Sequence, residues 1–135
     1  MQQWLYMIIE VKVKDITEYL PVQNSIVNDI VKQYKSLVNT DKDVSDCIKI
    51  SIDGNTIQIE LDAYIDVEYN SGGYGVTPYY ELYPKDEFES DFMYIINSVF
   101  EAALGADSYS VYCVENCVED DEALALRHYD FDGED

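Results

Sequence analysis

Positive charge is scarce in this chain, above all after the first third. Residues 50–135 contain two basic residues, Lys85 and Arg127, against 21 acidic ones, whereas residues 1–49 hold six basic and seven acidic residues. The formal net charge of the 135 residues is −20. An anionic surface of this density repels nucleic acid and anionic lipid, and it attracts proteins whose working surface is cationic. The charge therefore excludes direct nucleic-acid and membrane binding, and it indicates a basic nucleic-acid-binding protein or effector complex as the partner.

Catalytic motifs are missing as well. The chain has a single histidine, no Ser/His/Asp or Cys/His signature and no nucleophile elbow. The glycine-rich segment 72–75 lacks the spacing of a phosphate-binding loop and no lysine follows it, so it indicates a hairpin tip. A carboxylate pair for glycoside hydrolysis has little meaning in so acidic a chain. We expect a protein that is not an enzyme and needs no cofactor.

Cysteine is sparse, and metal ligands are few. The three cysteines are an odd count without a disulfide-framework spacing, which suits a reducing cytoplasm. Cys113, Cys117 and His128 form no recognisable metal motif, because no CxxC pair exists, and buried structural thiols are the favoured interpretation. The acidic run 119–122 lacks the spacing of an EF-hand. The sequence therefore predicts no metal site.

Long apolar runs are also lacking. Charged residues interrupt the apolar N-terminal stretch, so no signal peptide is expected. No window approaches the roughly 18 apolar residues that cross a membrane. We expect a cytoplasmic protein, which acts in the host cytoplasm if a phage encodes it.

Enough apolar residues are present for an ordered core. Hydrophobic residues make up 47 % of the chain and aromatic residues 13 %, which is unlike a disordered protein. The length fits one domain, which we place at residues 1–129, followed by an acidic tail at 130–135. A halophile-like surface is an alternative reason for the acidity, but halophilic adaptation spreads acids over the whole surface rather than over one part of the chain.

The periodicity of the apolar residues predicts an α+β domain. Alternation predicts strands, 3.6-residue spacing predicts two amphipathic helices, and Asp53-Gly54-Asn55 indicates a hairpin turn. The expected elements are strand 4–14, a helix opened by Pro21 and ending near 38, strands 48–52, 57–69 and 76–83, helix 85–104, strand 109–115 and a short strand 123–129. This order, β-α-β-β-β-α-β-β, favours a mainly antiparallel sheet with both helices on one face. The other face is then open to solvent.

The long strand 57–69 has one apolar face and one acidic face. Its acidic face carries Glu60, Asp62, Asp66 and Glu68, with Tyr64 between them. Residues two apart on a strand are about 6.6–6.8 Å apart, which is near two of the 3.4 Å phosphate rises of DNA. The alternative is an ordinary solvated sheet face, but such faces usually mix acids with bases. The row therefore predicts contacts with a cationic partner.

Two further groups complete the predicted interface. Acidic residues cluster at the start of the second helix, where the helix dipole alone explains two or three of them. Tyrosine is abundant, with 13 in the chain, and several surround the predicted hairpin after the acidic strand. Tyrosine is favoured both at interfaces and in strands. The expected partner-binding residues are Glu60, Asp62, Tyr64, Asp66, Glu68, Tyr74, Tyr79, Tyr80, Asp86, Glu87, Glu89 and Asp91.

In charge, in size and in the acidic face of strand 57–69, the chain resembles the small acidic DNA-mimic inhibitors of phages and mobile elements. These comprise anti-restriction and anti-CRISPR proteins and the inhibitor of uracil-DNA glycosylase. The resemblance includes no sequence motif and implies no particular fold. It implies a non-enzymatic inhibitor that occupies the nucleic-acid groove of a nuclease or of a CRISPR or restriction effector. Two alternatives stay open: an immunity or antitoxin protein against a basic toxin, and an acidic structural module that forms a homodimer through the tyrosine-rich hairpin.

Overall fold

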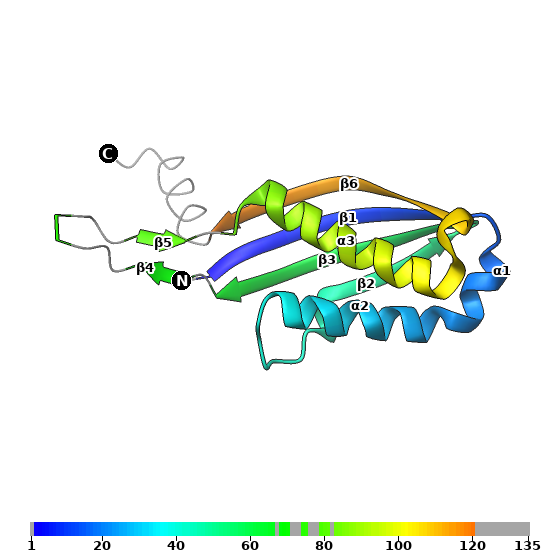
Figure 1. The fold of residues 1–135 in the computed structure, drawn as a ribbon, viewed down its shortest axis with the longest axis horizontal. Helices are drawn as coiled ribbons and strands as arrows, with labels where there is room; N and C mark the ends of the chain where they lie inside the picture. The colour runs from blue at the N-terminus through cyan, green and yellow to red at the C-terminus, as the bar shows by residue number, and fades with distance from the viewer. Residues whose placement is uncertain (1, 67, 71–73, 76–78, 82, 121–135) are drawn as a thin grey trace, which may run out of the picture.

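A four-stranded antiparallel sheet forms the centre of the protein (Figure 1). The structure is a computed structural model that describes residues 2–66, 68–70, 74–75, 79–81 and 83–120. The sheet has the order β2-β3-β1-β6, formed by β1 (Gln2–Val13), β2 (Ile48–Asp53), β3 (Thr56–Asp66) and β6 (Tyr109–Asp120). A separate two-stranded sheet pairs β4 (Glu68–Asn70) with β5 (Tyr79–Glu81). The predicted α+β class with a mainly antiparallel sheet is confirmed.

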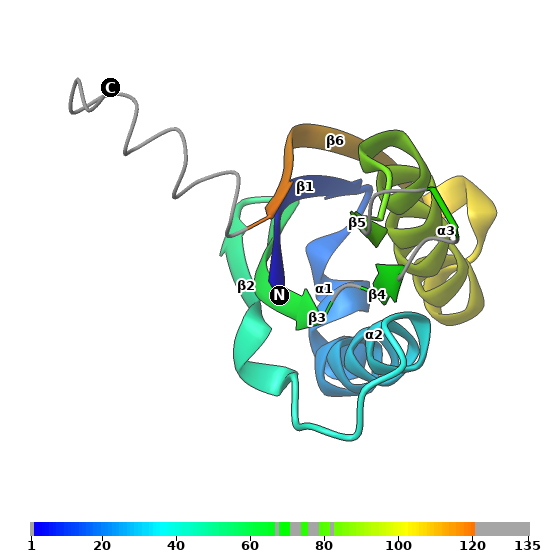
Figure 2. The ribbon, with the colours of Figure 1, turned by 90° about the vertical axis from the view of Figure 1, so that its left-hand side faces the viewer.

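Helices line one side of this sheet. Seen end-on in Figure 2, the sheet curves around α2 (Gln23–Leu37) and α3 (Lys85–Leu104), which lie side by side. A short α1 (Ile16–Tyr19) and the 3₁₀ turns 20–22, 45–47 and 106–108 connect these elements. Pro21, predicted to open the first long helix, instead lies in the 3₁₀ turn between α1 and α2. The chain enters the helical layer earlier than predicted because Asp15 caps α1, its side chain accepting a hydrogen bond from the Thr17 backbone N–H at 3.0 Å.

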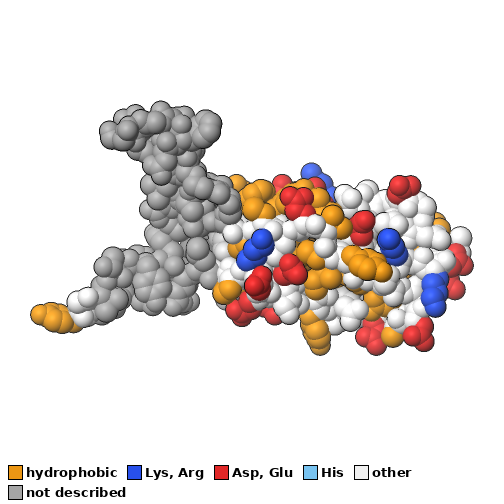
Figure 3. Space-filling model, turned by 90° about the horizontal axis from the view of Figure 1, so that it is seen from above, with side chains coloured by type: hydrophobic (Ala, Val, Ile, Leu, Met, Phe, Trp, Pro, Cys, Tyr) orange, Lys and Arg blue, Asp and Glu red, His pale blue; other side chains and the backbone are white. Residues whose placement is uncertain are grey.

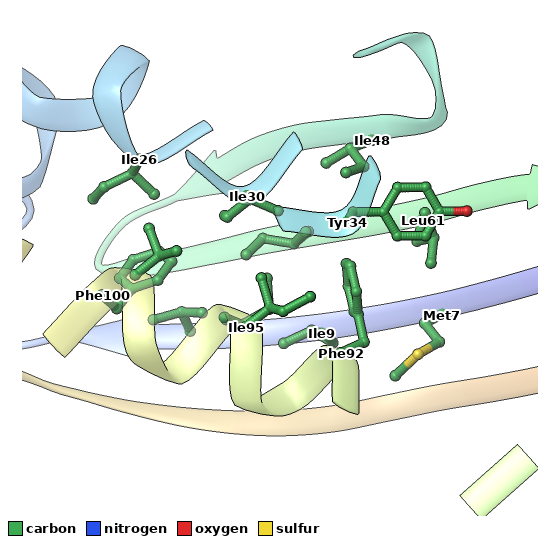
Figure 4. Close-up of a cluster of buried hydrophobic side chains, with 14 of the residues drawn as sticks. Met7, Ile9, Ile26, Ile30, Tyr34, Ile48, Leu61, Phe92, Ile95 and Phe100 are labelled. Atoms are coloured by element: carbon green, nitrogen blue, oxygen red, sulfur yellow. The ribbon is translucent and has the colours of Figure 1, made fainter. Parts of the chain in front are cut away.

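The core lies between the sheet and the two long helices (Figure 4). Strand alternation directs one set of β1 and β3 side chains to the helices, and these are buried. The buried strand residues include Leu5, Met7, Ile9, Val11, Ile57, Ile59 and Leu61. Those of the helices include Ile26, Ile30, Tyr34, Phe88, Phe92, Ile95, Ile96 and Phe100. The remaining set of β1 and β3 side chains forms the opposite face of the sheet.

The predicted strand 57–69 corresponds to two described strands, β3 and β4. The β1–β3 register runs to the pair Gln2↔Asp66. Glu68–Asn70 instead pairs with β5 outside the main sheet. β6 extends to Asp120, which pairs with Gln3, so the first half of the acidic run 119–122 is strand. The predicted strand 123–129, the tail 130–135 and half of the predicted segment 76–83 lie outside the described residues.

Tyr19 is a buried polar residue at the edge of the core. Its ring is fully buried and stacks on that of Phe100, with the centroids 5.9 Å apart. Its hydroxyl has no hydrogen-bond partner among the described residues. Burial raises the pKa of Tyr19 to about 12. Ionisation of this side chain is therefore unfavourable in the folded protein.

We expect Tyr19→Phe to increase the free energy of unfolding at pH 7 by about 1 kcal/mol, because it removes an unsatisfied buried group. The pKa of Tyr19 is raised on folding, so the unfolded chain releases the hydroxyl proton more readily, and the folded parent loses stability as the pH rises from 10 to 12. The variant should therefore lose less stability than the parent in this range. Urea denaturation at pH 7 and pH 11 measures both effects, and destabilisation at pH 7 would show that the hydroxyl has a partner.

Candidate functional site: the open face of the sheet

The face of the sheet that the helices leave uncovered carries part of the predicted acidic row. Glu60, Asp62, Tyr64 and Asp66 alternate along β3 with residues that point into the core, such as Leu61. Asp62 and Asp66 are exposed, Glu60 is half-buried, and the Tyr64 side chain is 52 % exposed. The structure thus brings these four predicted residues together on one surface, hereafter the open face.

Two aromatic residues of β1 hold the carboxylates of the open face. The Trp4 indole Nε1–H donates a hydrogen bond to Asp62 Oδ1 at 2.7 Å, and the Tyr6 hydroxyl donates one to Glu60 Oε2 at 3.0 Å. The two rings stack with their centroids 5.5 Å apart. The hydrogen bond to Glu60 raises the pKa of Tyr6, so the phenol keeps its proton and remains a donor. Both donors are neutral, so they fix the carboxylates in place without cancelling their charge.

Trp4 and Tyr6 were missed at the sequence level. Their position in strand 4–14, alternating with Leu5 and Met7, predicts that they share a face, but not which acids they meet. That depends on the register, in which Tyr6 lies opposite Asp62 and Trp4 lies opposite Tyr64. Each donor reaches the acid diagonally across from it, a separation that long side chains bridge.

Basic residues are present on the strands that neighbour β3. Lys49 of β2 lies directly opposite Glu60 in the register. Lys12 of β1 places its Nζ 5.4 Å from the centre of the Tyr112 ring of β6, which is a cation–π contact. β2 begins at Ile48, opposite Leu61, so Asp62–Asp66 extend past its end. The negative charge of the open face is therefore concentrated at the C-terminal end of β3.

The acidic residues of α3 lie in the helical layer, on the other side of the sheet from the open face (Figure 2). Asp86 and Glu87 are exposed. Glu89 accepts a hydrogen bond from Asn116 Nδ2 at 3.0 Å, which joins α3 to β6. Asp91 accepts one from the Tyr83 hydroxyl, whose pKa is raised by burial and by this carboxylate. Two of these four acids thus have structural partners, and the predicted set does not form one continuous surface.

The predicted tyrosine-rich segment lies beyond the end of the main sheet (Figure 1). Glu68 falls on β4, Tyr79 and Tyr80 fall on β5, and Tyr74 is fully exposed between these strands. The return of the chain from this segment is anchored by Gln3, a buried residue that was also missed at the sequence level. Gln3 Nε2 donates to the Tyr83 carbonyl and Gln3 Oε1 accepts from the Tyr83 N–H, both at 2.9 Å.

The surface over β6 and α3 differs from the open face. Figure 3 looks onto this side and shows acidic, basic and hydrophobic side chains interspersed. Val114 of β6 is 58 % exposed. No continuous acidic patch is seen in this view of the described residues.

A metal centre has no support in the described part of the chain. No group of three His, Cys, Asp or Glu residues there is arranged to hold a metal ion. Cys47, Cys113 and Cys117 are half-buried, and burial raises the pKa of the Cys113 thiol. His128 lies outside the described residues. Among the described residues, none of the helices combines the length and the hydropathy that a membrane span requires.

No protein family, curated protein or solved structure matches this chain. The resemblance to DNA-mimic inhibitors is one of charge and size, and it stays a prediction. The features of the molecule that bear on its function are therefore the charges, the exposure and the hydrogen bonds of the open face.

Proposed function

We propose that the protein is a non-enzymatic inhibitor that binds the cationic nucleic-acid surface of a nuclease or of a CRISPR or restriction effector. The observation that carries this proposal is the end of β3, where Asp62 and Asp66 project from a solvent-exposed sheet with Tyr64 between them. In this role the carboxylates occupy the places of DNA phosphates in the groove of the partner. The protein would act in the cytoplasm of the cell that contains that enzyme.

The fixed geometry of the carboxylates supports mimicry rather than solubility alone. A solubilising acid needs no defined orientation, whereas a phosphate mimic gains affinity when its charges are held in place before binding. The hydrogen bonds from Trp4 and Tyr6 supply such preorganisation to Asp62 and Glu60. Exposed Tyr64 adds apolar contact area between the charges, as aromatic residues do at the centres of interfaces.

The remaining acids contribute at longer range. With a net charge of −20, the whole chain produces a field that steers a cationic partner toward it, even from residues that make no contact. Asp86 and Glu87 serve this purpose from the helical layer. The open face then supplies the contacts, and the rest of the surface raises the association rate.

Affinity capture from a nuclease-treated lysate tests the proposal. The immobilised protein should retain a basic nucleic-acid enzyme at low salt and release it at high salt, because the attraction is electrostatic. Capture of a basic secreted toxin instead would indicate an immunity protein. Salt-independent self-association with no cationic partner would overturn the proposal in favour of a structural module.

A further inference from the structure

A cavity of about 440 Å³ lies where the acidic end of β3 meets the C-terminal end of α2. Its lining includes Tyr34, Asn39, Asp43, Cys47, Tyr64 and Asp66. Tyr64 and Asp66 also belong to the open face, so the cavity is continuous with the proposed interface. Its volume is within the range of about 300–1,000 Å³ that is typical of ligand sites.

The lining of this cavity includes a buried tyrosine, Tyr34. The Tyr34 side chain is 1 % exposed, and its ring packs edge-on against Phe92 with the centroids 5.9 Å apart. Figure 4 shows the hydroxyl pointing away from Phe92, along β3 toward the C-terminal end of that strand. Burial raises the pKa of Tyr34, so this hydroxyl stays neutral and offers an acceptor to a bound donor.

The charged groups that line the cavity favour the binding of a cation. Asp43 and Asp66 line it together with one ammonium group, that of Lys42. The Ser45 backbone N–H, 3.0 Å from Asp43 Oδ1, lowers the pKa of Asp43 and keeps this carboxylate ionised. The pKa of the Cys47 thiol is raised, mainly by burial and to a smaller extent by nearby carboxylates. The effect of the carboxylates indicates a negative potential at this position. Those carboxylates are Asp46, Asp62 and Asp43.

The end of α2 adds to this potential. Asn39 has a positive φ of 52°, and its N–H donates to the Ser36 carbonyl at 3.2 Å. The Thr40 N–H donates to the Lys35 carbonyl at 3.3 Å, which completes a Schellman motif. The motif turns the chain sharply, so Asn39 and Thr40 both line the cavity at the negative end of the helix dipole.

We propose that this cavity binds an arginine side chain of the cationic partner. A guanidinium is planar, is weakly hydrated and donates in several directions, so it can pair with Asp43 or Asp66 and stack on the Tyr64 ring. The Tyr34 hydroxyl accepts a further N–H. A lysine ammonium lacks the planar stacking surface and binds more weakly. The inference rests on the proposed function only for the source of the arginine, not for the affinity of the cavity.

Titration with N-acetyl-arginine methylamide, followed by ¹H–¹⁵N NMR, tests the cavity without any partner protein. We expect shifts confined to residues 34–47 and 64–66, with half-saturation on the order of ten millimolar. The neutral citrulline analogue, at matched ionic strength, should produce none of them. Asp43→Asn with Asp66→Asn should weaken binding at least fivefold, whereas Asp86→Asn with Glu87→Asn, the same charge change outside the cavity, should leave it unchanged.

The outcomes separate this inference from the proposed function. Shifts that spread over the whole acidic surface, or that are equal for citrulline, overturn the arginine site while leaving the DNA-mimic proposal open to its own test. Saturable, localised shifts with no capture of a nucleic-acid enzyme would support the site and refute the proposed partner class. A lysine analogue that binds as tightly as arginine would contradict the assignment to a guanidinium.

Discussion

Replacing Phe92 with alanine should lower the free energy of unfolding by about 3–5 kcal/mol, the usual cost of deleting a buried phenylalanine ring. Phe92 is fully buried at the centre of α3, where its ring contacts Tyr34 edge-on and stacks on Phe88. Both ring centroids lie 5.9 Å from that of Phe92. Small domains are stable by about 5–15 kcal/mol, so this one ring carries a large share of the total. Urea denaturation monitored by circular dichroism measures the loss.

Tyr94→Ala is the matched control for that experiment. Tyr94 lies on the same helix two residues further on, and its side chain is 72 % exposed. Its truncation should change the free energy of unfolding by no more than about 0.5 kcal/mol. Similar losses for the two variants would contradict the assignment of the buried face of α3. Truncation of Phe92 also removes the ring that packs against Tyr34, so Phe92→Ala should weaken arginine binding in the cavity.

Reversing two charges on the open face should reduce partner affinity about a hundredfold at low salt. The double variant Asp62→Lys with Asp66→Lys places two cations where the partner surface is itself cationic, and like charges at an interface are strongly unfavourable. The affinity and the association rate can be measured by surface plasmon resonance with the captured enzyme at two salt concentrations. The difference between variant and parent should shrink at high salt because screening weakens both attraction and repulsion.

Asp86→Lys with Glu87→Lys changes the net charge by the same amount in the helical layer. It should slow association through the weaker long-range field but reduce affinity less than about fivefold, because these residues lie away from the open face. Equal losses for the two double variants would show that only the net charge matters. That result would remove the basis for a defined interface at β3.

Local patterns predicted the parts of the fold that depend on neighbours in sequence. The alternation from Ile57 to Ile65 predicts which β3 side chains face solvent, and the spacing of Phe88, Phe92 and Ile95 predicts the buried face of α3. The first long helix, expected to end near residue 38, ends at Leu37, and Asn39 after it has a positive φ. These signals are set by strand and helix geometry, which a short window of sequence contains.

Features that depend on register could not be predicted in this way. The pairing of Glu68–Asn70 with β5 rather than with β1, and the pairing of Lys49 with Glu60, depend on how segments distant in sequence align. The hydrogen bonds of Trp4 and Tyr6 likewise join strands more than 50 residues apart in sequence. The acids of α3 are separated from the open face because the helices pack on the opposite side of the sheet. The sequence shows how many acids there are, but only the fold shows which of them share a surface.

Competition with DNA for the captured enzyme tests the central claim most directly. The protein and a duplex DNA that the enzyme binds are titrated against each other, and free and bound species are resolved by analytical ultracentrifugation. Phosphate mimicry predicts mutually exclusive binding: excess DNA displaces the protein, and the Asp62→Lys/Asp66→Lys variant fails to displace DNA. A stable ternary complex of enzyme, DNA and protein would contradict the account, because the carboxylates of the open face could not then occupy the sites of the phosphates.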